Sequence, residues 1–170
     1  MLVCTGAPRS GTSLVCQTMQ ILGVPMAAPA FLPEHENIRE FNPGGFYELD
    51  DMFGIDHHLY KGMGVKLFGA QLYGTDKQYI SKLIWVVRNR DEAIESYEKM
   101  RPRLKHSYVS SEKVFDANIA LIKACVDKDT MIVKLKDIKE KPEEFISNLS
   151  IYLHLHPNEA QIRRARKNIT

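Results

Sequence analysis

The chain alternates short apolar runs with longer stretches in which apolar residues recur at helical spacing. The apolar runs predict buried β-strands over residues 2–5, 64–68, 83–87 and 131–135. The helical spacing predicts helices over residues 11–22, 47–60, 91–100, 111–126, 142–153 and 157–168. Strands that are apolar on both faces lie in parallel sheets that helices cover on both sides. The pattern therefore predicts an α/β fold, a three-layer α/β/α domain with a mainly parallel sheet of about four to five strands.

One long segment, residues 25–45, shows neither an apolar run typical of a strand nor the helical spacing of apolar residues. It contains four prolines, so we expect an irregular loop there. Loops of this length within a compact domain are usually functional, because binding residues concentrate on loops that a rigid scaffold holds in place. The segment is therefore a candidate for part of a functional site.

Length and charge indicate one domain over residues 1–170 and exclude some classes of partner. The 170 residues suffice for one hydrophobic core and are too few for two. The formal net charge of +2 gives no general field for nucleic acid or for a membrane surface, so we expect no nucleic-acid partner. The sequence has no apolar run long enough to span a membrane and no signal-peptide pattern, so we expect a cytoplasmic protein.

The cysteine and histidine pattern indicates neither a disulfide framework nor a metal site. Cys4, Cys16 and Cys125 are odd in number, widely spaced and without a C-x-x-C pair. The sequence also lacks the H-x-x-x-H spacing of common metal sites. We therefore expect free thiols and no bound metal.

A glycine-containing loop, residues 6–13, joins the first predicted strand to the first predicted helix. Gly6 and Gly11 match the Walker A frame G-x-x-x-x-G, but Thr12 stands where that motif has lysine, and the cation of this loop is Arg9. Small residues let the backbone wrap an anion, and the N–H groups at the start of a helix supply positive potential. The loop therefore predicts an anion site in a P-loop-type domain.

The same loop disfavours two known anion-binding enzymes. ATP or GTP hydrolysis needs the missing lysine and usually an acidic residue that holds Mg²⁺ at a strand end. A tyrosine-phosphatase loop needs five residues between its cysteine and its arginine, whereas four separate Cys4 from Arg9.

The loop resembles the 5′-phosphosulfate loop of the PAPS-dependent sulfotransferases, in the P-R-S-G-T-[ST] form of short bacterial members. The resemblance implies that PAPS (3′-phosphoadenosine-5′-phosphosulfate) is the co-substrate and 3′,5′-ADP the product. It implies that Arg9 contacts the bridging oxygen that is released. The residues that would cradle the 5′-phosphate are Pro8, Arg9, Ser10, Gly11, Thr12 and Ser13.

A second element of the resemblance lies after the third predicted strand. Arg88 ends that strand, and Asn89 with Glu92 three residues later predicts a helix start of the capping-box type. Ser96 lies about two turns into this helix. Sulfotransferases bind the 3′-phosphate of the donor with an arginine and a serine at this spacing, so the resemblance assigns that role to Arg88 and Ser96.

Two further segments extend the resemblance, and one expected element is missing. Residues 41–48 resemble the N-P-x-G-[FY]-[FY]-E element of short bacterial sulfotransferases, and residues 64–67 resemble their second strand. The R-K-G-x-x-G-D-W-K element near the family's C-terminus is absent, and the basic residues 163–167 do not match it.

The resemblance also suggests the acid–base groups of the reaction. Lys66 matches the lysine of the K-T-H segment of animal cytosolic members, and we expect it to contact the sulfuryl oxygens. The catalytic histidine of that segment falls on Phe68. Glu48 is therefore the first candidate for the general base, and Glu34, His35 and Glu36 in the long loop come behind it.

The sequence leaves three functions open. The first is sulfuryl transfer from PAPS to a hydroxyl or amine, the second a P-loop nucleotide or metabolite kinase, and the third a non-catalytic nucleotide-binding module. The acceptor, whether carbohydrate, lipid, small molecule or peptide, is not readable from the sequence, and neither is the oligomeric state.

Overall fold

Four parallel strands form the centre of the molecule. The computed structural model describes residues 1–30, 33–49, 58–104 and 109–170. Its strands pair in the order β2-β1-β3-β4, every pair parallel, so the predicted α/β class and parallel sheet are confirmed. The strands are β1 (Leu2–Thr5), β2 (Gly64–Leu67), β3 (Lys82–Val87) and β4 (Met131–Lys134).

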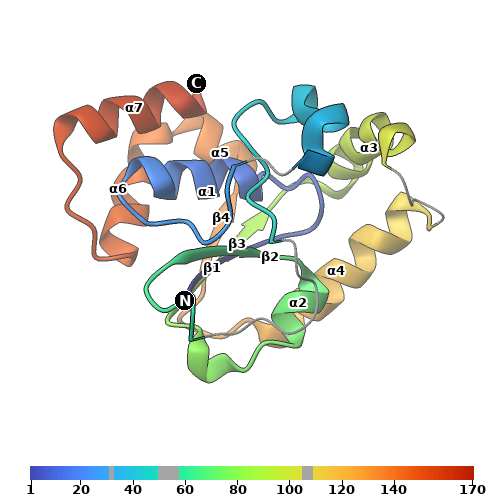
Figure 1. Ribbon diagram of the computed structural model, residues 1–170, viewed down its shortest axis with the longest axis horizontal. Coiled ribbons are helices and arrows are strands. Elements are labelled where there is room, and N and C mark those ends of the chain that lie inside the picture. The colour runs from blue at the N-terminus through green and yellow to red at the C-terminus, as the bar shows by residue number, and fades with distance from the viewer. Residues whose placement is uncertain (31–32, 50–57, 105–108) are drawn as a thin grey trace.

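Helices cover both faces of this sheet, as the sequence predicts (Figure 1). The first face carries α1 (Thr12–Ile21), α5 (Leu135–Glu140), α6 (Pro142–Tyr152) and α7 (Glu159–Ile169). The second face carries α2 (Gly69–Tyr73) and α4 (Ser111–Cys125). The remaining helix, α3 (Arg90–Met100), packs against α4 beyond the end of β3.

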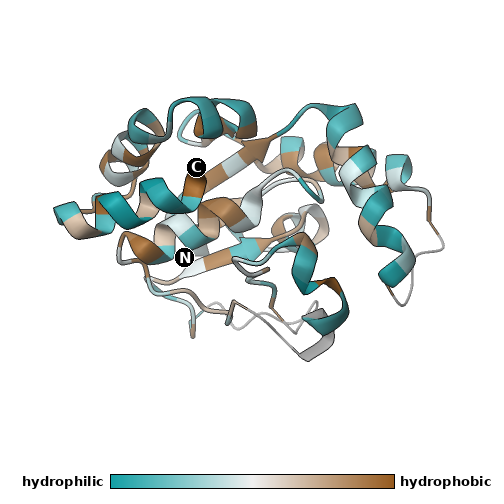
Figure 2. Cartoon of the chain, turned by 90° about the horizontal axis from the view of Figure 1, so that it is seen from above, coloured by the Kyte–Doolittle hydropathy of each residue, from teal (hydrophilic) through white to brown (hydrophobic). Residues whose placement is uncertain are grey.

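Apolar side chains fill the space between the layers. The larger core lies under α1, α6 and α7, where Met19 and Leu149 are completely buried against the strands. A second core lies under α2 and α4 and includes Val65 and Ile122. Viewed from above, the strands are mostly hydrophobic and the outer sides of the helices mostly hydrophilic (Figure 2). Burial on both faces explains why the strand sequences are apolar without alternation.

The register of the strands brings their carboxyl ends to one edge of the sheet. Thr5 at the end of β1 lies opposite Leu67 of β2 and Trp85 of β3, and Val87 lies opposite Lys134. The segments that follow all four strands therefore meet at this edge, which is where open α/β sheets bind ligands.

Several element boundaries differ from the predictions. The sequence does not predict α2 and α5, because these helices are short and begin just after β2 and β4. Pro157 precedes the N-cap Asn158, so it is not in the first turn of α7. The irregular-loop prediction is wrong for part of residues 25–45, because a 3-10 helix, η1 (Pro33–Phe41), forms there. The helix predicted over residues 47–60 lies mostly outside the described residues, and 47–49 are not helical.

The predicted start of α3 is confirmed, with one change. Asn89 is the N-cap, and its side chain accepts hydrogen bonds from the N–H groups of Asp91 and Glu92. The carboxylate of Glu92 pairs with Arg88 at 3.2 Å rather than reaching back to the backbone of Asn89. The helix that carries Ser96 is thus fixed at its first turn, close to Arg88.

Removing this cap should have a modest and specific cost. We expect Asn89→Ala to lower the free energy of unfolding by about 1 kcal/mol, because two backbone N–H groups lose their acceptor. Asn89→Asp keeps the acceptor oxygen and should match the wild type in urea denaturation. Equal stability of the Ala and Asp variants would show that the cap does not hold the helix.

The state of the cysteines and the length and polarity of the helices agree with the predictions from the sequence. Cys4, Cys16 and Cys125 are all free and buried. Within the described ranges, the helices are all too short or too polar to cross a membrane.

Candidate functional site

The loop after β1 adopts a conformation that only particular residues allow. Gly11 has a φ of 100°, and a Cβ atom on it would lie 2.6 Å from Cδ1 of Leu135. A Cβ atom on Gly6 would lie 2.7 Å from the carbonyl oxygen of Val86. Both glycines are therefore required for the close approach of this loop to β3 and α5.

The loop presents the start of α1 to the strand-end edge. Gly11 is the N-cap of α1 and makes no side-chain cap, and the first turn contains no acidic residue. Helix N-termini of this kind carry N–H groups and positive potential that favour an anion. Ser10, by contrast, points inward: it is 1% exposed, and its hydroxyl has no partner among the described residues.

Arg9 links the loop to two other segments. It has a positive φ of 65°, and its Nε donates to Oγ of Ser96 at 3.1 Å. Its Nη2 donates to the carbonyl oxygen of Phe41 at 2.9 Å. The loop, helix α3 and the end of η1 therefore meet at this one guanidinium.

Arg88 lies next to Arg9, so two cations share one region. Nη1 of Arg88 donates to the carbonyl oxygen of Arg9 at 3.1 Å, and its Nε pairs with Glu92. Burial and the neighbouring Arg88 guanidinium lower the pKa of Arg9 from its ordinary value. In the described part of the chain, Arg9 has no carboxylate partner. An anion placed between the two arginines would relieve their repulsion.

Lys66 forms a buried cluster on the other side of the loop. This lysine is 5% exposed, and its Nζ lies 3.0 Å from Oε1 of Glu48. The same ammonium donates to the carbonyl oxygen of Phe46 at 2.8 Å and to Oγ of Ser13 at 3.2 Å. Ser13 in turn donates to the carbonyl oxygen of Phe46 at 3.3 Å. Lys66, Glu48 and the first turn of α1 therefore form one hydrogen-bonded unit.

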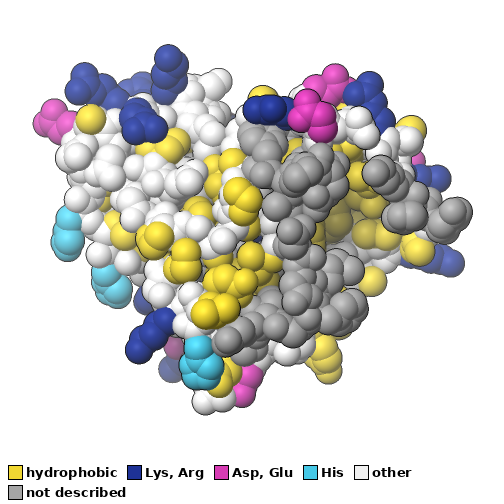
Figure 3. Space-filling view, in the orientation of Figure 1, with side chains coloured by type: hydrophobic (Ala, Val, Ile, Leu, Met, Phe, Trp, Pro, Cys, Tyr) yellow, Lys and Arg dark blue, Asp and Glu magenta, His cyan; other side chains and the backbone are white. Residues whose placement is uncertain are grey.

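A cavity of about 680 Å³ connects these groups. It lies at the carboxyl ends of the strands, and between η1, α3 and α4 hydrophobic side chains gather in a hollow of the molecular surface (Figure 3). This volume is in the range of sites for small organic ligands. The predicted site residues that line it are Pro8, Arg9, Gly11, Thr12, Ser13, Glu48, Lys66 and Arg88.

Two predicted residues stand apart from this lining, and the side chain of a third is not described. Ser10 is buried within the loop, and Ser96 is held by Arg9 rather than exposed in the cavity wall. His35 belongs to η1, but its side chain lies outside the described part of the structure. This candidate for the base is therefore not placed.

The cavity also contains residues that the sequence does not single out. These residues are mostly apolar and come from η1, α3, α4, α5 and the turn after α3: Ile38, Tyr97, Met100, Leu104, Val114 and Leu135. Leu135 directly follows β4, so the strand-end rule gives a signal for it. The others carry no recognisable motif and are brought to the site by packing alone.

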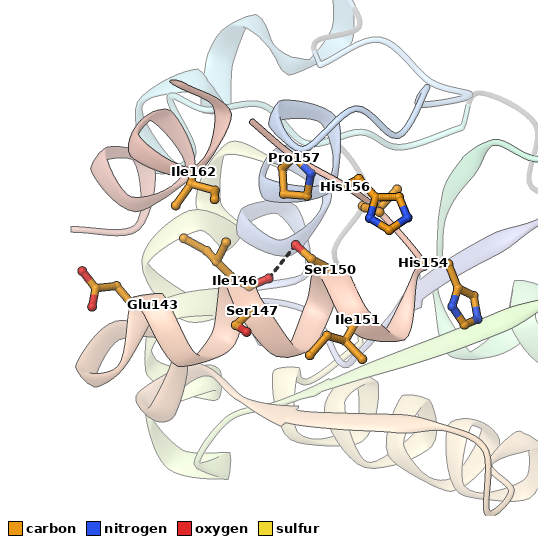
Figure 4. A pocket seen from close by; sticks show the side chains of 10 residues that line it. Glu143, Ile146, Ser147, Ser150, Ile151, His154, His156, Pro157 and Ile162 are labelled. Carbon is orange, nitrogen blue, oxygen red and sulfur yellow. Dashed lines mark hydrogen bonds between the residues drawn. The ribbon is translucent and has the colours of Figure 1, made fainter. Parts of the chain in front are cut away.

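A second groove, between α6 and α7, has a different character. It has a volume of about 670 Å³ and is lined by apolar residues such as Ile146 and Ile162, with His154 and His156 at its border (Figure 4). Ser150 is turned back onto the carbonyl oxygen of Ile146 at 2.8 Å. None of the predicted site residues lines this groove, so we place the functional site in the strand-end cavity.

Among the described residues, no group of three or more His, Cys, Asp or Glu side chains lies close enough together to hold a metal ion.

No protein-family model matches the chain, and a search of curated protein sequences also gives no match.

Proposed function

We propose that this protein is a sulfotransferase that moves the sulfuryl group of PAPS to a hydroxyl or amine and releases 3′,5′-ADP. The observation that carries the proposal is the pair of arginines at the phosphate loop. Arg9 and Arg88 approach each other in one cavity, and Arg9 lacks a carboxylate partner among the described residues. A donor with one anionic group at its 5′ end and another at its 3′ position matches two cations and a helix N-terminus.

The chemistry we propose is an in-line displacement at sulfur. The acceptor oxygen or nitrogen forms a bond to sulfur while the bond from sulfur to the bridging phosphate oxygen breaks. The electron pair of that bond stays with 3′,5′-ADP. Arg9 and the N–H groups at the start of α1 stabilise the charge that develops on this leaving group.

Glu48 receives the acceptor proton in this scheme. Its carboxylate lines the cavity and is only partly exposed, so it is accessible to a bound acceptor. Lys66 holds that carboxylate at 3.0 Å and is itself fixed by Ser13 and the carbonyl of Phe46. Lys66 therefore orients the base and brings a positive charge beside the position of the sulfuryl group.

The cysteines suggest the compartment in which the protein acts. Three free, buried cysteines fit a compartment that keeps thiols reduced, and we propose the cytoplasm. The donor site we propose uses no metal ion, since positive charge comes from the two arginines and the helix start.

Titration calorimetry without Mg²⁺ tests the proposal directly, with 3′,5′-ADP, 5′-AMP and ATP as ligands. We expect 3′,5′-ADP to bind at least tenfold more tightly than 5′-AMP, because only 3′,5′-ADP carries the second phosphate. Arg88→Ala should weaken the binding of 3′,5′-ADP by about 10- to 100-fold, which is the effect of removing a charge-assisted hydrogen bond. Its effect on 5′-AMP should be much smaller.

Arg90→Ala is the matched control for this experiment. Arg90 is the first residue of α3, two positions after Arg88. Its guanidinium pairs with Asp116 at 2.8 Å on the exposed surface, so Arg90→Ala should leave the affinities for all three ligands unchanged. Tighter binding of ATP, or a requirement for Mg²⁺, would instead indicate the P-loop kinase. Binding of 3′,5′-ADP without transfer to any acceptor would indicate the non-catalytic module.

A further inference from the structure

The order of the strands divides the cavity into two ends. The phosphate loop follows β1, which lies between β2 and β3. Arg88 follows β3, so a donor held by Arg9 and Arg88 extends toward β3 and β4. The opposite end, next to β2, is left for the acceptor. We call it the acceptor end and define it by Phe46, Glu48, Lys66 and Phe68, which gather around the ammonium of Lys66.

Among the described residues that define the acceptor end, the charges balance. Lys66 and Glu48 form an ion pair at 3.0 Å, with the lysine almost completely buried. Arg9 and Arg88 are the cations that the donor's anionic groups require. An anionic acceptor would lie close to the carboxylate of Glu48, and a cationic one close to the ammonium of Lys66, so a charge of either sign would meet a like charge of the pair. The acceptor end therefore suits an uncharged molecule.

Hydrogen-bonding capacity at this end is also largely used within the chain. The neutral amide side chains that line this part of the cavity are Asn42 and Asn118. Nδ2 of Asn42 donates to the carbonyl oxygen of Gly45 at 2.6 Å. Asn118 accepts from the N–H of Gly69 at 2.9 Å and donates to the carbonyl oxygen of Val114 at 2.8 Å. A molecule with many hydroxyl groups would lose its water there without gaining partners.

Aromatic rings make up much of the remaining surface. Phe41, Phe46 and Phe68 line the cavity, and Nζ of Lys66 lies 5.1 Å from the centre of the Phe68 ring. The Phe68 ring therefore lies beside the ammonium of the ion pair and adds apolar surface to the cavity.

From charge, hydrogen bonding and lining together, we propose that the acceptor is an uncharged, apolar alcohol, and that Phe68 determines this preference. The proposal rests on the proposed sulfotransferase function. It excludes carbohydrates and charged alcohols as preferred acceptors, because each of their extra polar groups would be desolvated without a partner.

The test compares three alcohols that share a six-membered carbon ring. They are 4-tert-butylcyclohexanol, myo-inositol and 4-hydroxycyclohexanecarboxylate, offered with radiolabelled PAPS. We expect kcat/KM for the first to exceed that for the other two by about 100-fold, because an apolar pocket discriminates against an added hydroxyl by about that factor and each unpaired polar group or charge costs desolvation free energy. Phe68→Asn should lower kcat/KM for 4-tert-butylcyclohexanol about tenfold while the affinity for 3′,5′-ADP stays constant.

Tyr73→Asn is the control, because Tyr73 is an aromatic residue of the neighbouring helix α2 that is 62% exposed and outside the cavity lining. It should leave transfer unchanged. Preferred transfer to inositol or to the carboxylate would overturn the inference, and so would 3′,5′-ADP binding with no transfer to any of the three alcohols. Failure to bind 3′,5′-ADP at all would instead overturn the proposed function.

Discussion

Arg9→Met should lower kcat/KM for PAPS by about 100- to 1,000-fold, the loss expected when one preorganised donor to a developing negative charge is removed. Arg9 is the cation of the phosphate loop and lines the cavity, so it is placed to contact the leaving phosphate group. The variant also loses the hydrogen bonds to Ser96 and to the carbonyl oxygen of Phe41. We therefore expect weaker donor binding as well as slower transfer, measured by calorimetry with 3′,5′-ADP and by initial rates with radiolabelled PAPS.

Arg103→Met separates the role of Arg9 from general support of η1. The guanidinium of Arg103 lies 5.3 Å from the centre of the Phe41 ring and pairs with Glu40, but it does not line the cavity. Arg103→Met should leave the affinity for the donor within about threefold of the wild-type value, because surface ion pairs contribute little to stability. If Arg9→Met and Arg103→Met have equal effects on donor affinity, Arg9 is a structural link and not a donor-binding residue.

Lys66→Met should lower the free energy of unfolding by about 2–3 kcal/mol and abolish most of the transfer activity. The substitution keeps the length of the side chain but removes the ammonium that pairs with Glu48, and the carbonyl of Phe46 and the hydroxyl of Ser13 each lose a donor. Removing one member of a buried pair is costly because the remaining charge has no compensation. The partial exposure of Glu48 reduces this cost, since water can reach its carboxylate.

A double-mutant cycle with Glu48→Gln measures the coupling between the two side chains. Glu48→Gln removes the charge that Lys66→Met strands, so the double variant should be about 1 kcal/mol more stable than the sum of the single effects predicts. Urea denaturation of the four proteins gives this value. Additive effects would mean that Lys66 and Glu48 do not stabilise each other, and Lys66 would then not orient the base.

The architecture follows from local features of the sequence. Leu2–Thr5 and Lys82–Val87 are short and apolar on both faces, and helical periodicity marks the segments between the strands, so the layers and the parallel sheet are predictable. The N-cap at Asn89 is a local signal and is also predictable. The η1 helix is not, because the four prolines of residues 25–45 indicate a loop, and the 3-10 helix depends on how this segment packs against the rest of the chain.

The candidate site divides in the same way. The glycines and Arg9 of the phosphate loop, and Arg88 at a strand end, are recognised from spacing, because chain geometry alone brings the ends of parallel strands to one edge. The contact of Arg9 with Ser96 and with the carbonyl of Phe41 joins residues far apart in the chain, and no spacing rule predicts it.

The sequence by itself therefore determines the layers of the fold, the glycine-containing loop after β1 and the position of Lys66 on a strand. Each of these depends on interactions between neighbouring residues or on the regular period of a strand or helix. Only the tertiary structure decides that Lys66 is buried against Glu48 and that Arg9 and Arg88 share one cavity. It alone also brings Phe41, Phe46 and Phe68 into the lining of that cavity. These arrangements depend on how distant segments pack, and packing optimises the burial of the whole core, which is not encoded in the spacing of any one segment.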